Sequence, residues 1–101
     1  MADNPNYPVS TAAISWVDTS GNVHLRVYSC DGYTVTERSS DPGATWTTGT
    51  FSQPGAAVSA TCWQDHAGVH IRVYCTNDDQ TIEWCQDPGS QTWFQGQYTT
   101  Q

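Results

Sequence analysis

The feature that most constrains the fold is an internal repeat, which occupies nearly the whole 101-residue chain. A polar leader over residues 1–10 is followed by a first copy over residues 11–53 and a second copy over residues 54–101. The clearest echo is the hexapeptide VHLRVY at residues 23–28, which returns as VHIRVY at residues 69–74. Because the two copies share one pattern, each is predicted to form the same structural unit.

Each copy contains four short segments that are bounded by glycine, proline, asparagine or aspartate and that favour β-strands. The predicted strands cover residues 11–17, 23–30, 33–40 and 45–51, and then 58–64, 69–75, 80–86 and 92–98. Four strands in one repeat of this size are typical of a β-propeller blade. The sequence therefore predicts an all-β chain with two four-stranded blades. A single eight-stranded sandwich or barrel with an internal duplication is the alternative.

Two blades do not close a ring, because propellers have about four to eight blades. The two outer faces would stay exposed unless other copies of the chain covered them. A cyclic, head-to-tail homo-oligomer is therefore expected. A dimer, a trimer or a tetramer would supply four, six or eight blades, and the periodicity does not choose among them.

The charge of the chain excludes several kinds of partner. The formal net charge is −7, with no lysine and only three arginines. Nucleic acids and anionic membrane surfaces both attract clustered positive charge, so neither is expected as a partner. No segment approaches the ~18 apolar residues of a membrane span, and residues 1–10 lack the apolar core of a signal peptide. Direct membrane insertion is not expected, and the predicted location is the cytoplasm or the exterior after non-classical export.

The cysteines are predicted to be free thiols. The equivalent positions in the other copy hold serine or threonine, which suggests small buried or half-buried sites of limited volume. No pair has the CxxC spacing of a redox or metal motif. The positions concerned are Cys30, Cys62, Cys75 and Cys85.

Two of the three arginines occupy equivalent places in the repeat, and each is followed eleven residues later by a glutamate. In the first copy Asp31-Gly32 favours a two-residue hairpin turn. With that turn, Arg26 lies directly opposite Glu37, and the matching turn of the second copy places Arg72 opposite Glu83. Opposed residues have Cβ atoms about 4.5–5.5 Å apart on one face of the sheet. The register thus predicts two cross-strand Arg–Glu pairs.

We interpret these pairs as ligand-holding groups. An exposed ion pair is worth only ~0–1 kcal/mol, so stability gives little reason to duplicate one in a chain almost without positive charge. Arginine donors beside carboxylate acceptors suit a neutral molecule with vicinal hydroxyls. Trp46 and Trp93 recur late in the two copies and would supply an apolar platform, which together with the pairs fits a sugar. The alternatives are purely structural ion pairs and tryptophans that only pack between blades.

Other chemistries fit less well. His24 and His70 lie in separate copies without a close second ligand, so they are predicted to be packed or hydrogen-bonded rather than zinc ligands. The repeated Asp-Pro-Gly at residues 41–43 and 87–89 is turn chemistry, and glutamates opposite arginines stay ionised. Two carboxylates free to flank a scissile glycosidic bond are therefore missing. The remaining repeated or strand-borne tryptophans are predicted to be core or packing residues: Trp16, Trp63 and Trp84.

At this point the chain resembles the fucose-binding lectins typified by the orange-peel mushroom lectin. The likeness covers residues 11–98. In the first copy it is carried by AAISW (12–16), LRVY (25–28), TER (36–38) and WTTG (46–49). In the second copy it is carried by IRVY (71–74), EWC (83–85) and WFQG (93–96). Two copies in about a hundred residues resemble the short bacterial members, which form six-bladed propellers as homotrimers, and the resemblance therefore implies a trimer.

The resemblance also implies where the sugar binds. In such lectins each site lies between adjacent blades, with arginine and glutamate from one blade and tryptophan from the next. Two sites for L-fucose and fucosylated glycans follow for each chain, the first within the chain and the second between subunits. The implied first site consists of Arg26, Glu37, Thr50, Gln86 and Trp93. The implied second site consists of Arg72, Glu83, Ser40, Trp46 and Gln97.

One departure concerns the position three residues after each glutamate. The family commonly has an aromatic residue there, and this chain has Ser40 and Gln86. Polar replacements suit another hydroxyl pattern, or a weaker monosaccharide affinity that multivalency restores on a surface. The expected protein is a multivalent, calcium-independent lectin without catalysis, cofactor or metal. A small glycosidase or sialidase-like propeller and a structural ring that binds protein are the alternatives.

Overall fold

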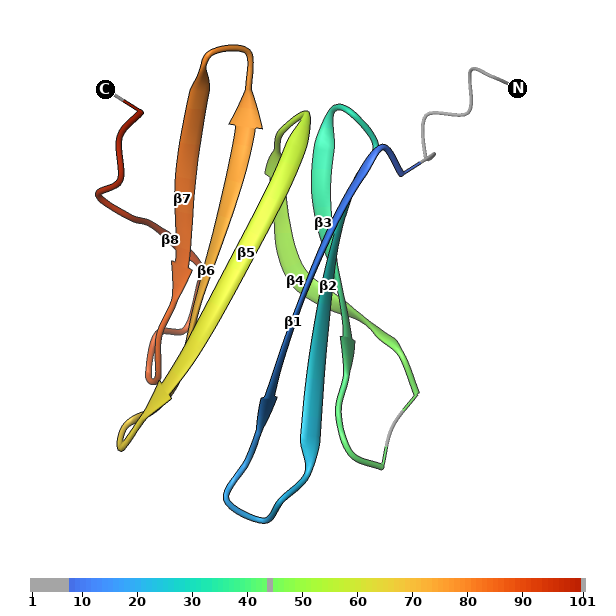
Figure 1. Cartoon of the computed structure of the whole chain (residues 1–101), viewed down its shortest axis with the longest axis vertical. Coiled ribbons are helices and arrows are strands. Elements are labelled where there is room, and N and C mark those ends of the chain that lie inside the picture. The colour runs from blue at the N-terminus through green and yellow to red at the C-terminus, as the bar shows by residue number, and fades with distance from the viewer. Residues whose placement is uncertain (1–7, 44, 101) are drawn as a thin grey trace.

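The computed structural model describes residues 8–43 and 45–100, which form two antiparallel four-stranded sheets (Figure 1). The first sheet contains β1 (Ser10–Val17), β2 (Val23–Cys30), β3 (Thr34–Ser40) and β4 (Thr47–Pro54). The second contains β5 (Ala57–Asp65), β6 (Gly68–Asn77), β7 (Gln80–Gln86) and β8 (Phe94–Gln95). Strands that are neighbours in the chain are neighbours in each sheet. The predicted all-β fold with two four-stranded units is confirmed.

The two ends of the described chain differ from the predicted boundaries. Residues 1–7 of the predicted leader lie outside the described residues, and the Val9 amide donates to the Cys30 carbonyl at 2.7 Å. The last strand is shorter than predicted, because β8 has only two residues whereas β4 has eight. Beyond β8 the Tyr98 amide donates to the Glu83 carboxylate instead of to a β7 carbonyl. No helix in the described part of the chain is long and apolar enough to cross a membrane.

Aspartate side chains shape the turns between strands. Asp18 accepts hydrogen bonds from the amides of Ser20 and Asn22 at 2.9 and 3.0 Å, which closes the β1–β2 connection. Asp31 accepts from the amides of Tyr33 and Thr34, both at 2.9 Å, in the β2–β3 connection. Such local bonds are the reason that aspartate favours turns.

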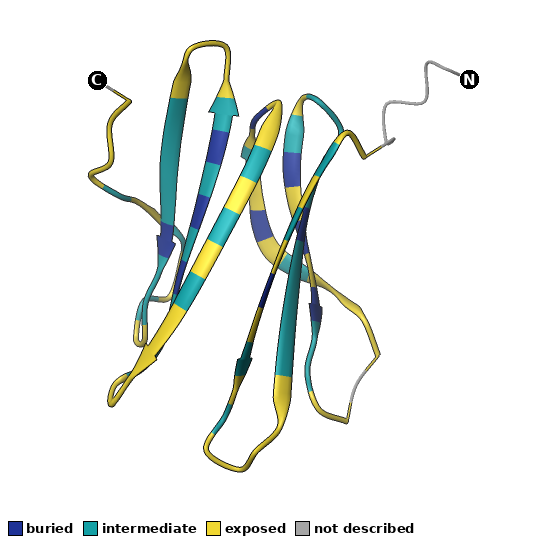
Figure 2. Cartoon of the chain, in the orientation of Figure 1, coloured by how far each residue is buried: buried dark blue, intermediate teal, exposed yellow. Residues whose placement is uncertain are grey.

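The core forms where the two sheets face each other. We call the side of each sheet that carries its repeated arginine and glutamate the arginine face, and the opposite side the valine face. The arginine face of the first sheet packs against the valine face of the second, and β5 lies beside β1. The buried residues from the two sheets are Ile14, Tyr28, Cys30, Val35 and Phe51, and Ile71, Val73 and Cys75. Along β5 the side chains alternate between half-buried and exposed, as the bands in Figure 2 show.

Close contact between the sheets depends on small groups. A Cβ atom at Gly55 would lie 3.1 Å from both the Cys75 Cβ and a Val35 methyl carbon, so a larger residue would push the sheets apart. The Cys30 thiol donates to the Gly55 carbonyl at 3.0 Å. All four cysteines are free thiols, as predicted. Burial raises the pKa of the Cys75 thiol to about 11.

Two faces of the pair remain uncovered, and large apolar side chains are exposed on both. On the valine face of the first sheet, Val17 and Val23 are 50% and 55% exposed. On the arginine face of the second sheet, Trp63 and Tyr98 are 44% and 49% exposed. Phe51, which is equivalent to Tyr98, is only 2% exposed between the sheets. Equivalent aromatic residues are thus covered in one copy and open in the other.

Candidate functional site

The strand register differs from the predicted one by two residues. Arg26 lies opposite Ser39, and Glu37 lies opposite Tyr28. The prediction of a two-residue turn at Asp31-Gly32 was wrong. The last strand pair is Cys30 with Val35, so residues 31–34 all lie between the paired residues. A shift of two residues leaves every side chain on its predicted face, since the side-chain period of a strand is two. Arg26 and Glu37 are therefore diagonal neighbours on one face rather than an opposed pair.

The second copy shows the same difference. Its turn is formed by Asp78 and Asp79 between the paired Asn77 and Gln80, one residue later than predicted. Asp78 adopts the left-handed conformation with φ 56°, which aspartate tolerates better than most residues. As a result, Arg72 lies opposite Cys85, and Tyr74 lies opposite Glu83.

Glu37 is held by donors from two strands. The Tyr28 hydroxyl donates to its Oε2 at 2.7 Å, and the Thr50 amide donates to its Oε1 at 3.0 Å. Glu37 is only 4% exposed, and Tyr28 is fully buried beside it. The neighbouring Gly49 makes this position possible, because a Cβ atom there would overlap the Glu37 carboxylate.

Glu83 has the equivalent surroundings in the second copy. The Tyr74 hydroxyl donates to its Oε2 at 2.7 Å, and Gly96 leaves room for the carboxylate. Burial and then the adjacent Glu83 raise the pKa of Tyr74 to about 12. Here Oε1 accepts from the Tyr98 amide at 3.1 Å, whereas the predicted site residue Gln97 is exposed.

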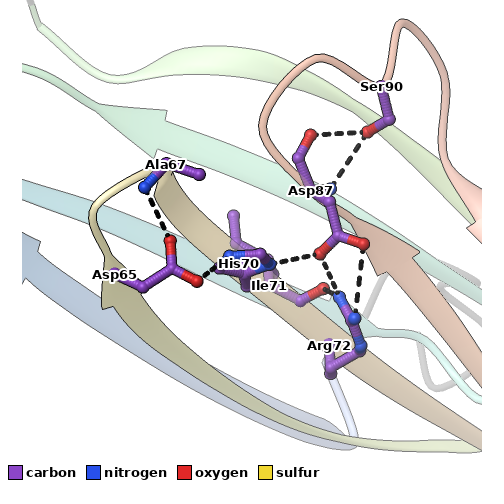
Figure 3. A network of polar contacts seen from close by, with 7 residues as sticks. All are labelled: Asp65, Ala67, His70, Ile71, Arg72, Asp87 and Ser90. Atoms are coloured by element: carbon purple, nitrogen blue, oxygen red, sulfur yellow. Dashed lines mark hydrogen bonds and ion pairs between the residues drawn. The ribbon is translucent and has the colours of Figure 1, made fainter.

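Each repeated arginine pairs with the aspartate that follows the third strand of its sheet, and not with the glutamate. Arg26 Nη1 donates to Asp41 Oδ1 at 2.9 Å, and Arg72 Nη1 donates to Asp87 Oδ1 at 2.8 Å. Figure 3 shows Arg72 and Asp87 side by side in this arrangement. The interpretation of residues 41–43 and 87–89 as turn chemistry alone was incomplete, because their aspartates orient the arginines.

Tryptophan lies beneath each guanidinium group. Arg26 Cζ is 4.8 Å from the ring centroid of Trp16, and Arg72 Cζ is 4.8 Å from that of Trp63. This geometry is a cation–π contact. Trp16 packs partly against the core, but the prediction that Trp63 is a core residue was wrong, since it is 44% exposed. Trp84 packs against the core as predicted.

A histidine connects two carboxylates in each copy, which confirms the prediction of hydrogen-bonded histidines. His24 Nε2 lies 2.9 Å from Asp18, and its Nδ1 lies 2.7 Å from Asp41. In the second copy His70 contacts Asp65 and Asp87 at the same distances of 2.9 and 2.7 Å (Figure 3). Among residues 8–43 and 45–100, no group of three or more His, Cys, Asp or Glu side chains is arranged to hold a metal ion.

Trp93 comes from the second sheet and contacts the predicted first-site residues of the first sheet. Its Nε1 donates to the Thr50 hydroxyl at 3.2 Å, and its ring packs against Phe51 with centroids 4.8 Å apart. Thr50 in turn donates its amide to Glu37, so three predicted site residues are joined directly across the two sheets. The predicted Gln86 lies on the facing valine face of the second sheet, opposite Ile71.

The tryptophan of the predicted second site lies on a different sheet from the arginine and glutamate of that site. Trp46 is 42% exposed and lines an open pocket of about 330 Å³ with Val27 and Arg38 on the valine face of the first sheet. The predicted Ser40 lies on this same face, opposite Leu25. Arg72 and Glu83 are on the uncovered arginine face of the second sheet, so the single chain does not bring them together with Trp46.

Several residues that surround the repeated glutamates and arginines were not predicted as site residues, although the sequence contained a signal for each. Gly49 and Gly96 recur at equivalent positions, as do Tyr28 and Tyr74. A glycine repeated within a strand signals that another group approaches the backbone closely. The repeated aspartates of the two Asp-Pro-Gly turns were noticed, but their partners come from a different strand.

A family model and a comparison with solved structures both match this chain to fucose lectins. A family model described as fungal fucose-specific lectin matches residues 5–101. The fold is similar to a fucose lectin from Kordia zhangzhouensis in complex with methyl-fucoside, with 38% identity and a TM-score of 0.74. That match covers 93% of this chain and 70% of the other. No match was found among curated proteins.

The fucose-specific lectin from Aleuria aurantia is also similar, with 30% identity and a TM-score of 0.69 over 87% of this chain and 30% of that one. Another structure of that lectin, described as a six-bladed β-propeller, has 33% identity and a TM-score of 0.64, with coverage of 87% and 30%. The matched share is close to the roughly one third that two blades of six would occupy. The two sheets are therefore a partial propeller unit.

Proposed function

Since the chain belongs to the family of fungal fucose-specific lectins, whose members bind carbohydrate without catalysis, we propose that it binds L-fucose and fucosylated glycans at two sites per chain. The observation that carries the proposal is the connection of Glu37, Thr50 and Trp93 across the two sheets. It combines an acceptor, a strand residue and an aromatic ring at the boundary between the two sheets, on the face that carries Arg26. The first site would lie there, within one chain.

The chemistry of this group suits a sugar. An ionised carboxylate has about four acceptor positions, and the bonds from Tyr28 and Thr50 occupy two of those of Glu37. In the bonds that the structure describes, Arg26 donates through Nη1, and its Nη2 and Nε hydrogens would donate to ligand hydroxyls. The Trp93 ring offers an apolar surface to the CH groups of a pyranose. Polar Gln86 across the gap would bind a hydroxyl rather than a methyl group.

The second site would need another copy of the chain. Its arginine and glutamate lie on the uncovered arginine face of the second sheet, and Trp46 lies on the uncovered valine face of the first. These faces are equivalent to the two that already pack together within the chain, so one copy can dock on the next in the same way. Three copies would give six blades, the number described for the Aleuria aurantia lectin. We therefore propose a homotrimer in which Ser40, Trp46 and Gln97 contribute to the sites between subunits.

Calorimetric titration with methyl-fucoside in buffer containing EDTA tests the proposal. We expect saturable binding of about two sugars per chain without added metal. Replacing Arg26 by alanine should remove one of the two sites, and replacing Arg72 should remove the other, so each variant serves as the control for the other. Absence of binding in the wild-type protein would refute the assignment. Binding of one sugar per chain would refute the second site.

The oligomeric state is a separate measurement. Sedimentation equilibrium should give a mass about three times that of the 11.1 kDa chain. A monomer that binds one sugar would support the site within the chain and reject the site between subunits. Arg72→Ala should leave the mass unchanged if the arginine serves the ligand and not the assembly.

A further inference from the structure

The histidine between the two aspartates has an unusual position. Each ring nitrogen of His24 faces a carboxylate, at 2.9 Å for Asp18 and 2.7 Å for Asp41. A carboxylate only accepts hydrogen bonds, so both nitrogens must carry hydrogen for both contacts to be favourable. An imidazole that donates twice is the protonated imidazolium. The geometry therefore selects the charged form.

The second copy repeats the arrangement with different surroundings. His70 lies between Asp65 and Asp87 at the same two distances, although its face of the sheet is uncovered (Figure 3). Bonds to Asp18 and then Asp41 raise the pKa of His24, and bonds to Asp87 and then Asp65 raise that of His70. An arrangement that recurs on a covered and an uncovered face does not depend on packing between blades.

The imidazole reaches the arginine through a shared atom. Asp41 Oδ1 accepts from both His24 Nδ1 and Arg26 Nη1, at 2.7 and 2.9 Å. The Trp16 ring stacks on His24, with centroids 5.2 Å apart and planes within 4°, and it also lies under the guanidinium of Arg26. The charged and aromatic groups that surround His24 are therefore Asp18 from the β1–β2 connection, Asp41 after β3, Arg26 of β2 and Trp16 of β1.

We propose that His24 and His70 are positioning residues, which hold the ligand-binding arginines in place only while their imidazole rings are protonated. The proposal rests on the proposed lectin function and adds a pH control to it. In the protonated state the imidazolium fixes the aspartate, and the aspartate fixes Nη1 of the arginine. The remaining guanidinium hydrogens then point in one direction, which lowers the entropy lost on sugar binding.

Deprotonation has a defined consequence. A neutral ring keeps one N–H and turns the lone pair of the other nitrogen toward a carboxylate oxygen, which is repulsive. The amides of Ser20 and Asn22 hold Asp18 in its turn. Asp41 is therefore the carboxylate that moves, and its movement frees Arg26. Sugar affinity should therefore decrease as the pH rises through the raised pKa of the histidines.

An Asp18→Asn/Asp65→Asn double variant separates positioning from a structural role. The amide NH₂ of asparagine can donate to a neutral histidine, whose other nitrogen then donates to Asp41 or Asp87. In this variant the neutral ring keeps both bonds, so the arginine stays in place at high pH. The matched control is Asp31→Asn, because Asp31 makes similar turn bonds to Tyr33 and Thr34 without contacting a histidine.

The experiment measures the affinity for methyl-fucoside by calorimetry from about pH 6 to about pH 9, an interval that begins below the ordinary histidine pKa of about 6.5. We expect the wild-type protein and the Asp31→Asn control to lose about tenfold in affinity, the lower end of the change seen when hydrogen-bond partners of metal-coordinating residues are removed. The double variant should show little change over this range.

Three results would be decisive. Wild-type affinity that is constant across the range rejects the positioning role, and so does an equal decrease in the double variant. If the double variant does not fold, the single variant Asp18→Asn takes its place, with the unchanged His70 group as the internal reference. Failure of the wild-type protein to bind at any pH rejects the proposed function itself, and thus differs from both of the other results.

Discussion

Tyr28 donates its hydroxyl hydrogen to Glu37 over 2.7 Å, in the cross-strand position that faces the glutamate directly. The tyrosine is fully buried and the glutamate is 4% exposed. The carboxylate of Glu37, which belongs to the proposed first site, is thus oriented by a residue of the core. The equivalent pair of Tyr74 and Glu83 has the same bond length on a face that the chain leaves open.

Removal of this hydroxyl should cost stability. In Tyr28→Phe the buried Glu37 oxygen loses its donor, and an unsatisfied buried group costs about 1–3 kcal/mol. Urea unfolding followed by tryptophan fluorescence measures the change. Tyr33→Phe is the control, because Tyr33 is 75% exposed, and it should change nothing. An unchanged midpoint for Tyr28→Phe would contradict the role of the bond, and an equal cost for Tyr74→Phe would indicate that assembly covers the second face.

Gly49 is predicted to be irreplaceable even by alanine. The added methyl group would overlap the Glu37 carboxylate, and overpacking of this kind costs about 1–3 kcal/mol. We expect Gly49→Ala to remove one sugar site while the protein stays folded, as shown by circular dichroism and titration with methyl-fucoside. Ser52→Ala, at an exposed position of the same strand, is the control. Retention of both sites in Gly49→Ala would show that Glu37 does not need its observed position.

The two late tryptophans should differ in what they stabilise. Trp93 packs against Phe51 within the chain, so Trp93→Ala should lower the free energy of unfolding by about 2 kcal/mol or more. Trp46 lies on an open face, so Trp46→Ala should leave the chain folded and shift the assembly toward monomers. Urea unfolding and sedimentation velocity distinguish these outcomes, with Tyr33→Ala as a control for loss of an exposed aromatic residue. A fully assembled Trp46→Ala protein would argue against the proposed interface.

The aspartate–histidine contacts predict a stability maximum in mildly acidic solution. The pKa values of His24 and His70 are raised above 6.5, so their contribution is complete below pH 6.5 and is lost as the pH rises through the raised values. Bonds to His24 and then Arg26 lower the pKa of Asp41 below 3.8, and bonds to Arg72 and then His70 do the same for Asp87. Their contribution is lost as the pH falls through those lowered values.

Thermal unfolding at one protein concentration across the pH range tests this expectation. The melting temperature should be highest between the two windows and should fall on both sides. His66→Gln should leave the profile unchanged, because His66 is exposed in the β5–β6 connection. A melting temperature that rises steadily toward alkaline pH would contradict the assignment of cationic histidines.

The two repeats, the eight strands and the face of each repeated side chain could be predicted from the sequence. These features depend on local patterns, since the period of a strand fixes the face of Arg26 and Glu37 whatever the turn length. Their direct opposition was wrong, because turns at residues 31–34 and at Asp78-Asp79 moved both registers by two residues. Local turn preference does not fix which residues form the turn where several turn-favouring residues are adjacent, as in Asn77-Asp78-Asp79.

The contacts between these groups became visible only in the folded arrangement of the sheets. Asp41 reaches Arg26 from another strand, and Gly49 admits the Glu37 carboxylate, although these residues are far apart in the chain. Such contacts depend on how strands bend and how sheets face each other, and a sequence pattern does not specify them. The difference between the covered Phe51 and the exposed Tyr98 is of the same kind. Equivalent residues of one repeat acquire different environments because only one of the two equivalent faces has a neighbour within the chain.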